Sequence, residues 1–165
     1  MRGTYYLAAW LIHMVARALL AGLVVSISAG GQTVTADQDL AFGDVFPGVP
    51  KTIEKTSSNA AEFTVTGTVD AEVTIDFDLP GYLYTTGANM PVYFYETDCA
   101  VDTTNPPDQS SPTLDDQNPY NTITYRIGSS GQMKVWLGGQ LMPGLTQKSG
   151  DYTAPIRVTV TYTGN

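Results

Sequence analysis

The sequence VTIDFDL at residues 73–79, closed by Pro80-Gly81, decides the fold class. Apolar and polar residues alternate along it, and a period of two places one set on each face of a β-strand. The same alternation returns near the carboxyl end, at Ile156, Val158, Val160 and Tyr162. We predict that these four side chains form the core face of the terminal strand.

Short alternating segments fill much of the remaining chain, at residues 63–69, 92–95, 123–127 and 133–137. Turns rich in glycine and proline separate them, and no segment after residue 30 has the 3.6-residue period of a helix. We therefore predict an all-β fold, a two-sheet β-sandwich of seven or eight strands.

Composition fits one exported domain. Hydrophobic residues are 42% of the 165, enough for a core. Cys99 is the only cysteine, so it forms no intramolecular disulfide, and we expect an inert, buried thiol. All 16 acidic residues follow residue 30, whereas two of the 8 basic residues, Arg2 and Arg17, precede it, leaving a net charge of −10. Such a surface repels nucleic acid and anionic lipid.

Residues 18–29, ALLAGLVVSISA, follow Arg17 as an apolar run that ends in small residues. This pattern is typical of a secretory signal peptide, here residues 1–29. We expect cleavage near Ala29, which puts the mature start between Ser28 and Asp37 and leaves no stable membrane anchoring. Residues 1–13 then read as a gene-start artefact before Met14.

A membrane anchor over residues 7–29 is the competing interpretation, since that length suffices to cross a bilayer. Arg17 would lie near its centre, at a cost of about 2.5–3.5 kcal/mol on the insertion scale. This cost favours a removable leader.

Residues 30–39 form an N-terminal extension before the sandwich domain at residues 40–165. In the extension Val34 and Ala36 alternate with polar residues, and Leu40 continues the period. We predict that this segment is a donor strand that pairs near the last strand of another copy. The rival is a closed monomer that residues 32–46 complete within their own sandwich.

Residues 96–122 are rich in proline, aspartate, serine and asparagine, and we predict a long surface loop. Its candidate interaction residues are Asp98, Asp102, Asp115 and Asp116. Carboxylates of this kind are Ca²⁺ ligands, but no calcium-loop spacing occurs, and solvated loop acids are the alternative. We predict no cofactor. The residues Tyr82, Tyr84, Tyr93 and Tyr95 are either a sugar-stacking platform or half-buried strand tyrosines.

Catalytic patterns are missing from the mature sequence. The only histidine, His13, lies in the leader, which excludes Ser-His and Cys-His pairs. Zinc-ligand spacing and phosphate-binding loops are also missing, and nothing marks a pair of carboxylates for glycoside hydrolysis. We predict a protein that is not an enzyme.

Several short motifs resemble a bacterial secreted family, the domain-of-unknown-function family 4402, over residues 33–163. They are LAFGDV at 40–45, FTVTG at 63–67, VWLGG at 135–139, and GDY at 150–152 with VTVTY at 158–162. That family is similar in outline to spore coat U-like and archaic chaperone–usher pilins, in which a glycine precedes a near-terminal tyrosine by about a dozen residues. Gly150 and Tyr162 match this spacing. The chain departs from many pilins in lacking a disulfide, and its tyrosine is not penultimate.

The resemblance implies an immunoglobulin-like antiparallel sandwich that lacks one strand. A periplasmic chaperone would complete it first, and the N-terminal strand of the next subunit would follow, by β-augmentation. The expected function is a structural, pilus-like subunit, exported through the periplasm to the cell surface. Its partners would be copies of itself or related subunits, a chaperone and an usher. The alternative is a monomeric secreted or surface-attached module that binds carbohydrate, calcium or a host surface.

Overall fold

The computed structural model describes residues 16–24 and 31–164, which contain fourteen strands and no helix. The predicted all-β sandwich is confirmed. Within these residues there is accordingly no apolar helix of membrane-crossing length. The other parts of the predicted leader, with residues 1–13 and the cleavage position at Ala29, lie outside the described residues.

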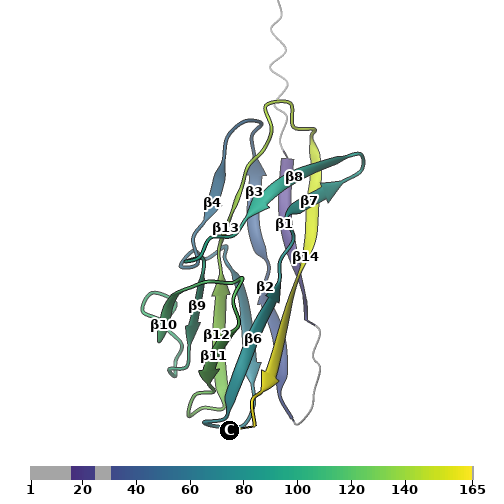
Figure 1. Cartoon of the computed structure of the whole chain (residues 1–165). Helices are drawn as coiled ribbons and strands as arrows, with labels where there is room; N and C mark the ends of the chain where they lie inside the picture. The colour runs from purple at the N-terminus through teal and green to yellow at the C-terminus, as the bar shows by residue number, and fades with distance from the viewer. Residues whose placement is uncertain (1–15, 25–30, 165) are drawn as a thin grey trace, which may run out of the picture.

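Two sheets pack face to face (Figure 1). The larger contains β1 (Ala16–Val24), β3 (Leu40–Val45), β4 (Lys51–Ile53), β6 (Glu72–Asp78), β7 (Tyr82–Thr85), β8 (Ala88–Tyr93), β11 (Ile123–Arg126), β13 (Gly139–Leu141) and β14 (Gly150–Tyr162). The smaller contains β2 (Thr33–Gln38), β5 (Ala61–Thr66), β9 (Cys99–Asp102), β10 (Leu114–Gln117) and β12 (Gln132–Leu137).

The order of the larger sheet is β11-β6-β14-β7-β8-β13-β4, with β1 beside β14 and β3 beside β1. The order of the smaller sheet is β10-β9-β12-β5-β2. Neighbours are antiparallel except β1 and β14, which run parallel. The larger sheet therefore places the first described strand next to the last.

The core lies between the sheets and is built from the alternating segments. On the smaller sheet β5 and β12 bury Phe63, Val65 and Val135, and on the larger sheet β6 buries Val73 and Ile75. Successive strand residues point to opposite faces, so the polar partners between them face water. The alternating apolar residues of the sequence thus form one buried face on each sheet.

β14 follows the same rule. Ile156, Val158 and Val160 are buried, and Tyr162 is half-buried. The Tyr162 hydroxyl accepts a hydrogen bond from the backbone N–H of Thr68 at 2.7 Å. β14 opens at Gly150, whose φ of 152° lies in a region that side chains rarely adopt.

The expected surface loop at residues 96–122 is wrong in two places, because the segment contains two paired strands. Leu114–Gln117 form β10, and Cys99–Asp102 form β9, a buried strand between β10 and β12. All four of its residues are buried, and Cys99, Ala100 and Val101 form a run with no polar residue between them. The segment therefore carries none of the period-two signal by which the other strands are recognised.

Candidate functional site

The most unusual part of the sandwich is the position of β1 between β3 and β14 (Figure 1, β1 in purple). The place that β1 takes between these two strands is called the groove below. β1 runs parallel to β14, from Ala16 opposite Gly150 to Val24 opposite Val158. It runs antiparallel to β3, with a bulge after Ala18. One segment from the predicted leader therefore joins the two strands into one sheet.

β3 depends on β1 for its place in the sheet. Among the described strands, β1 is the only partner of β3. On its other edge β14 has two partner strands instead of one. β6 pairs with residues 157–162, and β7 pairs only at Thr153. Pro155, which has no N–H to donate, lies in the gap between these two ladders. Without β1, one long edge of β14 would be unpaired and β3 would have no partner strand among the described residues, although the Ala41 N–H would still donate to the Asn59 carbonyl.

The groove is apolar on its inner side. Its side chains come from both flanking strands and are at most 5% exposed: Leu40, Phe42, Val45, Tyr152, Ala154, Ile156 and Val158. Tyr152 is fixed at its polar end, because its hydroxyl donates to the Lys148 carbonyl and accepts from Gln147 Nε2, both at 2.7 Å. Burial of one large apolar side chain is worth about 1.5–3 kcal/mol, so an empty groove would be costly.

The predicted donor residues lie inside their own sandwich. Val34 and Ala36 belong to β2, which pairs with β5, and Leu40 belongs to β3. Val34 and Leu40 are buried there. The structure thus brings Leu40 to the groove, and it places Val34 and Ala36 in the opposite sheet. Their transfer to another copy stays a prediction.

Comparison with known proteins bears on the same domain. The family model of the domain of unknown function DUF4402 matches residues 48–162. The chain belongs to this family. A search of the curated proteins found no match. The match includes β14 and begins after β3, so the DUF4402 region supplies one wall of the groove.

The acidic residues of the DUF4402 domain's 96–122 segment do not converge. Asp98 is buried and accepts a hydrogen bond from the Tyr95 N–H at 2.7 Å. Asp115 and Asp116 both bind Lys55. Burial alone would lower the pKa of Lys55, but hydrogen bonds to these two carboxylates outweigh it and hold the pKa above its ordinary value. In the described residues no group of three or more His, Cys, Asp or Glu is placed to hold a metal ion.

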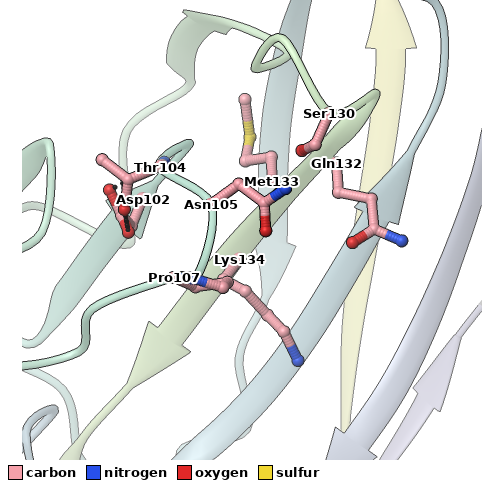
Figure 2. Close-up of a pocket in the computed structure, with 8 residues that line it drawn as sticks. All are labelled: Asp102, Thr104, Asn105, Pro107, Ser130, Gln132, Met133 and Lys134. Atoms are coloured by element: carbon pink, nitrogen blue, oxygen red, sulfur yellow. Dashed lines mark hydrogen bonds between the residues drawn. The ribbon is translucent and has the colours of Figure 1, made fainter.

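Asp102, expected on the surface, is fully buried at the end of β9. Its carboxylate binds the segment that follows, with bonds from Thr104, Asp108 and Thr113. Figure 2 shows the hollow beside it, whose volume is about 10 Å³, room for about one water. Asp102 therefore organises the loop from within and is not an interaction residue on its surface.

The four candidate tyrosines for a sugar-stacking platform are exposed. Tyr82 and Tyr84 on β7 are 43% and 57% exposed, and Tyr93 and Tyr95 are 50% and 49% exposed. The rings of Tyr82 and Tyr84 are 6.3 Å apart. The Tyr95 hydroxyl donates to Gln140 Oε1 at 2.7 Å. Sequence alternation found these residues, but it could not say which face of β7 looks outward.

Proposed function

We propose that the protein is a non-enzymatic, extracellular structural subunit that assembles into pilus-like filaments by strand exchange. The observation that carries this proposal is the groove between β3 and β14. The sandwich of residues 31–164 is closed there by a strand that lies outside it in sequence. A strand from another chain that enters the same groove would join two subunits through backbone hydrogen bonds and buried side chains.

The remaining properties of the chain agree with this role. The resemblance to spore coat U-like and archaic chaperone–usher pilins supplies the partners, a periplasmic chaperone that would fill the groove first and an usher that would deliver the subunit. The predicted leader and the strongly acidic sequence that follows it fit export and a solvated outer surface. The lasting partners would be copies of this chain or related subunits.

Electron microscopy and size-exclusion chromatography of the secreted full-length protein test the proposal. We expect filaments or ladders of oligomers that increase with protein concentration. The proposal is contradicted if the protein remains monomeric at every concentration, also after addition of a periplasmic extract from the cells that produce it.

A second candidate function is a secreted carbohydrate-binding module, and the exposed tyrosines favour it. Aromatic faces on the outer side of a sheet, with a hydrogen-bonding amide beside them, suit the apolar faces and hydroxyls of sugars. Titration with a panel of oligosaccharides, followed by tyrosine fluorescence, tests this. Binding that is lost in Tyr84→Ala supports the module, and no binding across the panel contradicts it.

A further inference from the structure

Exposed apolar side chains gather at the two ends of the sandwich. Apart from tyrosines, the described residues expose five large apolar side chains. Four of them lie in the β3–β4 loop at residues 46–50 and the β13–β14 loop at residues 142–149, which we call together the apolar end: Phe46, Val49, Met142 and Leu145. Both loops are at the upper end of the molecule in Figure 1. A single exposed apolar residue needs no explanation, but a cluster of four indicates a contact surface.

The two loops of the apolar end form one fixed surface. The Gly48 N–H donates to the Gly144 carbonyl at 3.1 Å and joins the loops. Gln147 is buried; its Oε1 accepts from the Gly144 N–H at 3.2 Å and its Nε2 donates to the Asn89 carbonyl at 2.9 Å. Leu145 is 87% exposed on this frame. A surface that is ordered before contact loses little conformational freedom on binding.

A hollow of about 450 Å³ lies at the opposite end, where the C-terminus is found (Figure 1). The fifth exposed apolar residue, Val69, lines it together with Tyr125 and Ile127, and Asp70 and Arg126 add one charge of each sign. The Asp70 N–H donates to the Ile127 carbonyl at 3.0 Å, which joins the β5–β6 and β11–β12 turns. A cavity of about 150 Å³ accepts a benzene ring, so this hollow has room for more than one large apolar side chain.

The charges of the two ends are complementary as well. The apolar end contains no acidic residue; it includes Lys148, and Lys51 follows directly. Both lysines donate only to backbone carbonyls among the described residues. At the hollow, the Asp70 side chain is 81% exposed, and its ion pair with Arg126 is long, at 3.8 Å. A lysine of the apolar end would therefore find a weakly paired carboxylate there, and such complementarity selects one partner and one orientation.

We infer that the apolar end of one copy of this chain docks into the hollow of a second copy, with Leu145 against Val69 and Tyr125. This inference rests on the proposed function and names surfaces outside the groove through which neighbouring subunits touch. The two surfaces differ and lie at opposite ends, so each contact leaves one apolar end and one hollow free and repeats without closing. It places subunits head to tail, and no strand has to leave its own sheet.

Cysteine crosslinking in the secreted full-length protein tests the inference. The double variant Leu145→Cys, Val69→Cys puts one thiol at each end, and both residues are exposed, so the fold should be retained. The native Cys99 does not interfere, since it is buried and burial raises its thiol pKa to about 12. The matched control is Tyr120→Cys, Val69→Cys, because Tyr120 is 62% exposed and belongs to neither surface.

Under mild oxidation we expect the Leu145→Cys, Val69→Cys variant to form a ladder of disulfide-linked multimers at least five-fold more abundant than in the control. Filaments without a link between positions 145 and 69 overturn the inference and leave the proposed function intact. A ladder from a protein that never forms filaments supports the contact and contradicts the filament function alone. Equal ladders from both variants show random collision and overturn the inference.

Sedimentation velocity gives an independent readout. Leu145→Glu should weaken self-association at least about ten-fold, as expected for loss of one buried anchor, whereas Leu145→Met should change it less than two-fold. Val69→Glu should have the same effect as Leu145→Glu, and the double variant should be no worse than either, because both changes remove one contact. A lipid surface is the alternative occupant of the apolar end. Binding to phosphatidylcholine vesicles that Leu145→Glu abolishes, with self-association unaffected by Val69→Glu, overturns the inference.

Discussion

Replacing Asp102 with alanine should destabilise the domain, because this carboxylate is the main acceptor for the segment after β9. It is fully buried. The backbone N–H donors that it binds belong to Thr103, Thr104, Asp108 and Thr113. The donors belong to half-buried or exposed residues that water can reach once the carboxylate is gone, so each lost bond is taken at about 0.5 kcal/mol, the low end for a net hydrogen bond, which gives about 2 kcal/mol for the four. This is a substantial part of a domain stability of about 5–15 kcal/mol.

The loss should depend on pH. Burial alone would raise the pKa of Asp102, but hydrogen bonds from Thr104, Thr113 and the neighbouring backbone outweigh it and hold the pKa well below its ordinary value. A carboxylate with a depressed pKa stabilises the fold above its unfolded pKa of about 3.9, and this contribution disappears as the pH falls through the folded pKa. The gap in stability between wild type and Asp102→Asn should therefore narrow below about pH 4.

Urea unfolding of the full-length protein, followed by circular dichroism at pH 7 and at pH 3, measures both effects. Asp115→Asn is the matched control, since this carboxylate is exposed and Lys55 keeps its second partner, Asp116, so the loss should stay within about 1 kcal/mol. A loss below about 1 kcal/mol for Asp102→Ala at pH 7, or a gap that stays constant with pH, would refute this account of Asp102.

Three further predictions follow from packing. Val158→Asp buries an unpaired charge in the groove and should cost several kcal/mol in urea unfolding, whereas Arg157→Ala on the outer face should stay within about 0.5 kcal/mol; equal losses would contradict the assigned faces. Gly138→Ala should destabilise, because its Cβ would lie 2.6–3.1 Å from backbone atoms of residues 53–55, at and just after the end of β4, whereas Gly81→Ala has open space and should be neutral by thermal melting. Cys99 should resist alkylation until urea unfolds the domain, and rapid labelling of the native protein would show that its strand is not packed as described.

The long alternating strands were predictable because each faces the core on one side and water on the other. Residues 73–79 and 156–162 carry this pattern, and the structure has β6 and β14 there. A half-buried strand must repeat its apolar residues every second position, so sequence and structure share one physical cause. The sandwich follows, because two such faces can be buried only against each other.

β9 was missed because its environment removes the signal. It lies between β10 and β12 with all four residues buried, and a short apolar run of this kind gives no period. The buried Asp102 was missed for a related reason. Its polar character predicts exposure. Its burial is possible because the surrounding loop donates hydrogen bonds to the carboxylate.

β1 was missed because one composition serves two roles. An apolar run after a basic residue is the pattern of a signal peptide, and the same residues suit a strand that fills an apolar groove. Sequence alone gives no reason to prefer the second role for residues 16–24. In the structure these residues pair with both β3 and β14, and no local sequence pattern contains that long-range information.

The stability of this fold does not depend on redox conditions, because Cys99 has no second cysteine in the chain with which to form a disulfide. The chain has one cysteine, and it is enclosed in β9. No disulfide has to form before the sheets pack, so folding requires no oxidant and no thiol isomerase. Thiol reductants have no crosslink to open, and the unfolding midpoint should be the same with and without them. An assembly of such subunits would tolerate reducing and oxidising surroundings equally well.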